Sequence, residues 1–137
     1  MKKRHCRRFS IPGTTLFYKK KPPLWRKGEY TDDFFPVLDI SRGGLKFLGN
    51  DRMSPGSELT IKLVFPNSGD EQPEIKAIVR WISRNREESY RYQTGVSFNA
   101  YGPGKKENPE EILSLLKSLE SSHIVLDEES LTSQQQE

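Results

Sequence analysis

Two groups of residues in this 137-residue chain have side chains that could bind an anionic ligand. The first is the N-terminal sequence Arg4-His5-Cys6-Arg7-Arg8, which places three guanidinium groups within five residues. A guanidinium group binds phosphate through a planar pair of N–H donors, and it also stacks on flat rings. The same pair of donors matches the O6 and N7 atoms of guanine. This group therefore suits a ligand that carries both phosphate and guanine.

The second group lies at the end of the strand-like sequence FFPVLDIS, residues 34–41. Side chains alternate along a strand, so Leu38 and Ile40 are expected to point inward while Asp39 and Ser41 point outward. Asp39 should then be exposed when no ligand is bound, and its carboxylate could accept hydrogen bonds from the N–H groups of guanine.

A glycine pair follows these polar residues directly. Gly43 and Gly44 permit positive φ angles and allow a ligand to approach the backbone closely. The alternative is that the carboxylate and the hydroxyl form only a local hydrogen-bonded turn. The residues alone leave both interpretations open.

The net charge of +3 hides a gradient along the chain. Residues 1–28 hold ten Lys and Arg and no acidic residue, residues 29–106 hold eleven of each sign, and residues 107–137 hold one Lys and eight acidic residues. A basic N-terminal arm on a neutral body favours an anionic partner, although charge runs are often only solvated.

Six short stretches have the alternation or the residue types of β-strands. They are residues 14–20, 34–41, 45–48, 57–65, 74–83 and 90–98. In the fifth stretch, Ile75, Ala77, Val79 and Trp81 alternate with polar residues and are predicted to share a face. Because no helix separates the six stretches, the pattern predicts an all-β antiparallel barrel or sandwich, and a barrel would leave no exposed edge.

One helix is predicted at residues 107–123. It is followed by an acidic and polar tail at residues 124–137, which is expected to be disordered. Asn108 is the predicted N-cap, Pro109 the first helical residue, and Glu111 completes a capping box. An apolar stripe is expected to pack on the barrel, or alternatively to bind a partner. The stripe consists of Ile112, Leu113, Leu115, Leu116 and Leu119.

Several function classes are disfavoured by what the sequence lacks. It contains no nucleophile elbow, Walker loop or HExxH motif, so we do not expect an enzyme or a cofactor. One cysteine and two histidines do not suit a zinc site, and no apolar run is long enough for a membrane span. The charged start and the single cysteine favour a cytoplasmic protein.

The arrangement of these residues resembles a known family. Arg4-x-x-x-Arg8, followed by Asp39-x-Ser41-x-x-Gly44, resembles the paired RxxxR and [D/N]xSxxG motifs of PilZ domains, which are bacterial receptors for cyclic di-GMP. The sequences AIVRW at residues 77–81 and TGVSF at residues 94–98 resemble later strands of that family. The resemblance implies a six-stranded antiparallel PilZ-like β-barrel with a C-terminal α-helix.

The resemblance also implies a binding site for cyclic di-GMP. The arginines would hold guanine edges and phosphates, Asp39 and Ser41 would hold a guanine, and Gly44 would keep the surface open. The residues predicted to bind the ligand are Arg4, Arg7, Arg8, Asp39, Ser41, Gly43 and Gly44. The predicted organisation is a switch arm at residues 1–13, a barrel at residues 14–106, and then the helix and the tail.

The predicted mechanism is ordering of the arm. The arm is expected to be mobile and outside the core until ligand binding fixes it, and an unidentified protein effector could then recognise the new surface. Two alternatives remain open. One is a small barrel that binds single-stranded nucleic acid, which the neutral charge of the barrel disfavours. The other is a PilZ-like adaptor that binds a protein and no nucleotide.

Overall fold

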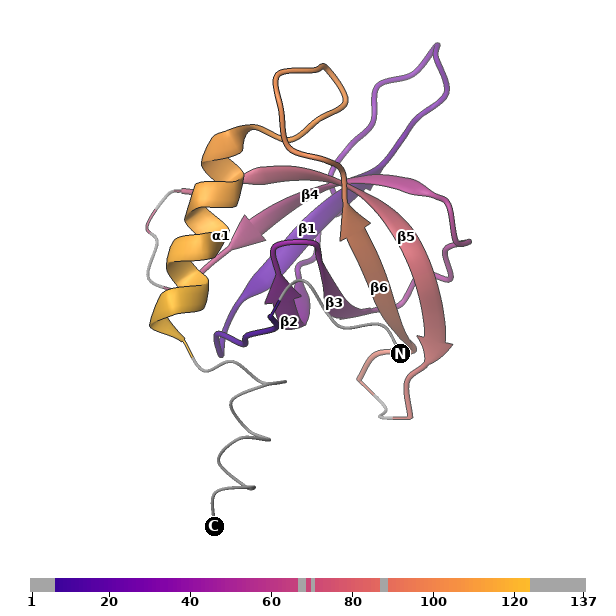
Figure 1. Cartoon of the computed structure of the whole chain (residues 1–137). Coiled ribbons are helices and arrows are strands. Elements are labelled where there is room, and N and C mark those ends of the chain that lie inside the picture. The colour runs from indigo at the N-terminus through magenta and orange to yellow at the C-terminus, as the bar shows by residue number, and fades with distance from the viewer. Residues whose placement is uncertain (1–6, 67–68, 70, 87–88, 124–137) are drawn as a thin grey trace, which may run out of the picture.

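The fold is a closed antiparallel barrel of six strands, followed by one helix (Figure 1). The computed structural model describes residues 7–66, 69, 71–86 and 89–123. The strand order around the barrel is β1-β2-β3-β6-β5-β4, so the predicted fold is confirmed. The elements are β1 (Thr15–Lys20), β2 (Phe35–Ser41), β3 (Gly44–Gly49), β4 (Glu58–Val64), β5 (Glu74–Arg84), β6 (Tyr92–Phe98) and α1 (Glu110–Ser122).

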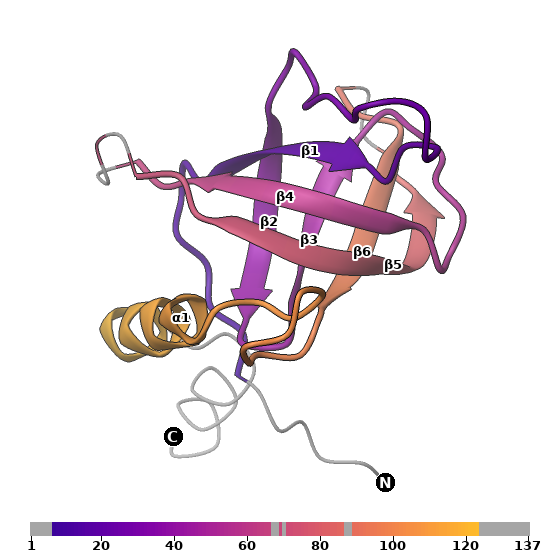
Figure 2. The same cartoon turned by 90° about the horizontal axis from the view of Figure 1, so that it is seen from above.

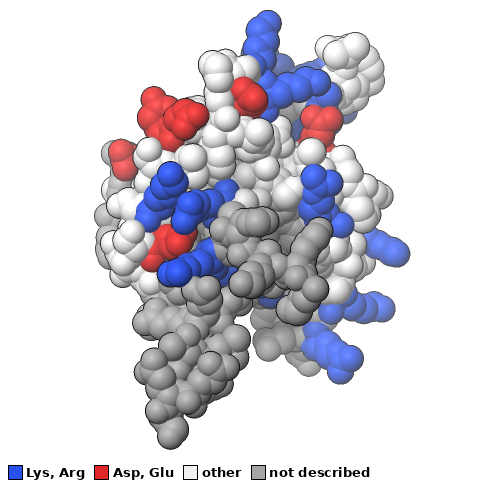
Figure 3. Space-filling model, viewed as in Figure 1, with Lys and Arg blue, Asp and Glu red and all other residues white. Residues whose placement is uncertain are grey.

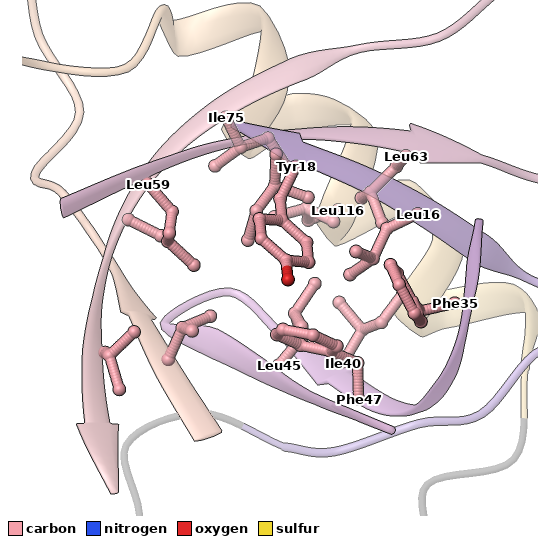
Figure 4. Close-up of a cluster of buried hydrophobic side chains, with 14 of the residues drawn as sticks. Leu16, Tyr18, Phe35, Ile40, Leu45, Phe47, Leu59, Leu63, Ile75 and Leu116 are labelled. Atoms are coloured by element: carbon pink, nitrogen blue, oxygen red, sulfur yellow. The ribbon is translucent and has the colours of Figure 1, made fainter. Parts of the chain in front are cut away.

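The core fills the inside of the barrel, and on β1, β3 and β4 every second side chain contributes to it. On β4, Leu59, Ile61 and Leu63 are all buried, as their alternation predicts. Figure 4 shows Tyr18 of β1 pointing into this core toward Phe47 of β3. Burial, together with the nearby Asp51 carboxylate, raises the pKa of the Tyr18 phenol above its ordinary value, so the phenol stays neutral.

Helix α1 lies against one end of the barrel, beside the end of β2 (Figure 2). Ile112 and Leu116 of its apolar stripe are buried in the main core. This agrees with packing on the barrel, which was the first of the two interpretations of the stripe.

The predicted start of the helix is wrong in two respects: the helix begins one residue later, at Glu110, and Asn108 is not its N-cap. Pro109 occupies the N-cap position, and no side chain caps the helix. Asn108 is instead 1% exposed, and its amide bridges two segments of the barrel. It accepts a hydrogen bond from the Lys76 N–H at 2.7 Å and donates to the carbonyl oxygens of Lys76 and Asn99. A buried amide must satisfy its hydrogen bonds, and these long-range partners are not visible in the local sequence.

The N-terminal segment departs from the predicted free arm. Phe9 is 0% exposed, and its backbone exchanges two hydrogen bonds with Ile40 of β2, at 2.8 and 2.9 Å. Its ring stacks on His123 at the end of α1, with 6.2 Å between centroids. The expectation that the whole arm lies outside the core is therefore wrong for Phe9, because a buried aromatic ring ties this residue to the barrel. Residues 1–6 lie outside the described part of the chain.

Candidate functional site

Five of the predicted site residues line one hollow of about 210 Å³ on the outer surface of the barrel. They are Arg8, Asp39, Ser41, Gly43 and Gly44. Arg7 is exposed and is not among the lining residues. Arg4 lies outside the described residues. The hollow thus joins the N-terminal segment to the turn between β2 and β3.

Asp39 lies in this hollow between two cations. Its Oδ2 atom is 3.8 Å from Nη1 of Arg8 and 3.6 Å from Nζ of Lys46. Both distances exceed those of a hydrogen bond, so these are ion pairs without a direct hydrogen bond. A ligand that presents N–H donors to the carboxylate and acceptors to the guanidinium could bind both groups at once.

The prediction that Asp39 is exposed is wrong, because only 8% of its surface is exposed. The pairing of β2 with β3 shifts register between Val37 and Asp39, so simple alternation does not hold there. Asp39 and its neighbour Ile40 are both buried, Ile40 in the core and Asp39 among the cations.

Ser41 and the two glycines shape the turn that follows. The Ser41 Oγ atom accepts a hydrogen bond from the Gly43 N–H at 3.1 Å, so the hydroxyl holds the turn. Neither glycine has a positive φ, which corrects that expectation. A Cβ on Gly44 would lie 2.1 Å from the Val96 carbonyl oxygen, so a side chain there would force β3 away from β6. Close strand packing is thus the reason for glycine at this position.

Sequence reasoning missed the opposite wall of the hollow, which β5 and β6 provide. Trp81 was predicted to share a face with Val79, but a register shift between these two residues turns it outward, and it is 42% exposed. A Cβ on Gly95 would lie 2.2 Å from the indole, so the ring rests directly on the backbone of β6. A glycine opposite a tryptophan on paired strands is the signal that could have located this wall.

The hollow has a positive charge balance. Lys46 and Arg80 join Arg8 on its lining, and Asp39 is the only acidic residue there among the described residues. Arg80 is held by a hydrogen bond from its Nε to Ser97 Oγ at 2.7 Å. Three cations, one carboxylate and one exposed aromatic ring suit an anionic ligand with a flat ring.

Helix α1 touches both segments that form the hollow. Arg42, in the β2–β3 turn, donates from Nε to Oε1 of Glu120 at 3.1 Å, and its carbonyl oxygen accepts from the Tyr101 hydroxyl at 2.6 Å. His123 stacks on Phe9, which follows Arg8. A change in the position of either segment would therefore alter contacts with the last turns of the helix.

The described residues contain neither a candidate metal site nor a candidate membrane-spanning helix. In the part of the chain that the structure describes, no group of three or more His, Cys, Asp or Glu could hold a metal ion. No helix within those residues is long and apolar enough to span a membrane.

Comparisons with known proteins agree with this fold. The family model described as the PilZ domain matches residues 2–114. No curated protein matches the chain. Among solved structures, the Bacillus subtilis Inhibitor of motility (MotI/DgrA) is similar, with a TM-score of 0.58 and 18% identity. The match covers 87% of this chain and 50% of that one, so the chain spans about half the length of that protein.

Proposed function

The chain belongs to the PilZ domain family, and from this premise we propose that it is a cytoplasmic receptor for cyclic di-GMP that relays binding to a protein partner. PilZ domains are binding and adaptor domains, so the proposed role is recognition without catalysis. The observation that carries the proposal is the hollow in which Arg8, Asp39 and Lys46 converge beside Trp81.

The proposed mode of binding assigns each group a partner on the ligand. Asp39 accepts hydrogen bonds from guanine N–H groups, and Arg8 donates to guanine O6 and N7 or to a phosphate. Lys46 and Arg80 neutralise phosphate charge, and the indole of Trp81 offers a ring face for stacking. In this scheme Arg4 completes the cation set from the N-terminal segment, as the motif implies, and Arg7, which lies between the motif arginines, contacts a phosphate through its charge alone.

The burial of Phe9 reduces the number of residues that the proposed ordering step has to fix. Because Phe9 is already buried against Ile40, the proposed ordering step spends no free energy on fixing Phe9 itself. Fixing each residue costs about 1–2 kcal/mol, so an arm anchored at Phe9 recovers that cost with fewer contacts than a wholly mobile arm. The contacts of Arg42 with Glu120 and of Phe9 with His123 provide a route from the hollow to α1, where we place the partner.

Calorimetric titration of the full chain with cyclic di-GMP tests the proposal. We expect saturable binding of cyclic di-GMP and much weaker binding of cyclic di-AMP, because adenine lacks the O6 acceptor and the N1–H donor of guanine. Absence of binding would leave the nucleotide-free adaptor as the better description. Binding of oligonucleotides irrespective of base, falling steeply with salt, would favour the single-stranded nucleic-acid alternative.

Replacement of Trp81 with alanine should weaken binding of cyclic di-GMP about two- to tenfold, because the ring face that stacks on a base is lost. The melting temperature should change little, since the indole is 42% exposed and lies on the outer surface. Trp81→Phe is the matched control, because it keeps a ring and should retain most of the affinity. Equal affinity of Trp81→Ala and the wild type would remove the stacking contact from the proposed mode.

A further inference from the structure

The loop between β1 and β2, residues 21–34, carries an apolar tip that the nucleotide site does not use. Leu24 is 103% exposed and Trp25 is 78% exposed. A hydrogen bond from the Arg26 N–H to the Pro23 carbonyl oxygen, at 3.0 Å, closes a turn with these two residues at its centre. Leu24 and Trp25 are therefore presented together at the tip of this turn.

The loop holds this tip in a defined position through contacts at its base. The Thr31 N–H donates to the Tyr18 carbonyl oxygen at 2.9 Å, and the Lys21 N–H donates to the Glu58 carbonyl oxygen at 3.1 Å. The Tyr30 hydroxyl donates to Glu74 at 2.6 Å. Exposure of Leu24 and Trp25 is thus a feature of an anchored loop.

Basic side chains lie next to the apolar tip in the sequence, and acidic ones follow later in the loop, at Glu29, Asp32 and Asp33. Residues 19–28 hold five Lys and Arg and no acidic residue, and two of these lysines, Lys20 and Lys21, pair with Asp51 and Glu58. Arg26 and Lys27 directly follow Trp25, and Lys105 and Lys106 lie on the β6–α1 loop, which projects from the same end of the barrel (Figure 1). Within the described residues these four cations form no ion pair. Figure 3 shows Lys and Arg side chains along this upper edge, together with uncharged side chains and some Asp and Glu.

We propose that the tip of the β1–β2 loop docks on an anionic phospholipid bilayer, with Leu24 and Trp25 in the interfacial region and the adjacent Arg26 and Lys27 on lipid phosphates. Tryptophan and leucine beside basic residues are the composition of interfacial anchors. Each cation near an anionic membrane surface adds to the attraction.

The size and chemistry of the tip favour a bilayer over other partners. Two side chains offer far less area than the roughly 800 Å² that each partner buries in a standard protein interface. Single-stranded nucleic acid would stack on Trp25, but it would leave the fully exposed Leu24 without a contact of its own. The docking tip also lies at the opposite end of β2 from the β2–β3 turn, so the hollow would remain accessible on the membrane.

Cosedimentation of the full chain with vesicles tests this proposal. Vesicles of equal parts phosphatidylcholine and phosphatidylglycerol should bind the protein, and vesicles of phosphatidylcholine alone should bind it weakly. The double substitution Leu24→Ser/Trp25→Ser should lower the partition coefficient about ten- to a hundredfold. Phe34→Ser is the control, because Phe34 is 57% exposed at the far end of the same loop and packs on Phe17.

The basic N-terminal sequence requires its own control, because it could also attract anionic vesicles. Binding that is lost in Lys2→Gln/Lys3→Gln and retained in Leu24→Ser/Trp25→Ser would overturn the proposal. So would equal losses in the tip and Phe34 variants, or no binding at all. Binding of oligothymidylate that depends on Trp25, without vesicle binding, would assign the tip to nucleic acid instead.

Fluorescence reports the depth of the tip directly. The chain has two tryptophans, so Trp81→Phe leaves Trp25 as the single tryptophan, whose emission can be excited selectively at wavelengths that tyrosine does not absorb. Its emission should shift to shorter wavelength with the anionic vesicles, and lipids brominated near the headgroup should quench it. Binding without a shift would mean that the cations hold the protein on the surface and that the tip does not insert, which contradicts the proposed docking.

Discussion

Replacement of Phe9 with alanine is expected to lower the free energy of unfolding by about 3–5 kcal/mol, which is the usual cost of removing a buried phenylalanine ring. The ring is 0% exposed, stacks on His123 and lies in the same core as Ile40. The same substitution should weaken binding of cyclic di-GMP, because it loosens the segment that holds Arg8 beside Asp39. Urea unfolding and calorimetric titration of one preparation measure both effects.

Two variants separate these effects. Phe34→Ala removes a phenylalanine of the same size that is 57% exposed, and it should cost much less stability than Phe9→Ala. Phe9→Leu keeps most of the buried apolar volume and should recover much of both stability and affinity. If Phe9→Ala unfolded at the same urea concentration as the wild type, the N-terminal segment would not be docked as the structure shows.

The barrel could be predicted from the sequence because its signals are local. Alternating residues such as Leu59, Ile61 and Leu63 identify a strand without reference to any other part of the chain. The errors occur where contacts with distant segments of the chain determine the role of a residue. Asn108 pairs with β5 in place of capping the helix, and Phe9 is buried because β2 and α1 meet around it. Neither contact leaves a periodic trace in the sequence.

In the candidate site, too, the residues that a local motif indicates were predicted, and those that strand pairing brings in were not. The motif resemblance indicated Asp39 and Ser41, and the structure brings both to one hollow with Arg8. Lys46 and Trp81 were missed because strand pairing alone places them there, and two register shifts change which side chains face outward. A bulge inserts one residue and reverses the alternation beyond it, so any prediction from alternation fails at such a point.

Replacement of Arg8 with alanine is expected to weaken cyclic di-GMP binding by about 1–3 kcal/mol, roughly ten- to a hundredfold, because a bidentate guanidinium contact is lost. The melting temperature should stay close to that of the wild type, since the Arg8 side chain is 33% exposed and its ion pair with Asp39 is long at 3.8 Å. Arg8→Lys is the matched control. It retains the charge but not the planar fork, so it should recover only the phosphate attraction.

Combining this substitution with Asp39→Ala shows whether the two residues act as one unit. Asp39 is proposed both to accept from guanine and to hold Arg8 in place, so Arg8→Ala should cost less affinity in the Asp39→Ala background than in the wild type. Lys46→Ala provides a comparison, because Lys46 also pairs with Asp39 but lies on β3, where strand pairing fixes its backbone. Losses that simply add for Arg8 and Asp39 would mean that each contacts the nucleotide independently. Unchanged affinity in Arg8→Ala would be the more serious outcome, because the arginine motif would then have no part in binding and the hollow would lose its proposed ligand.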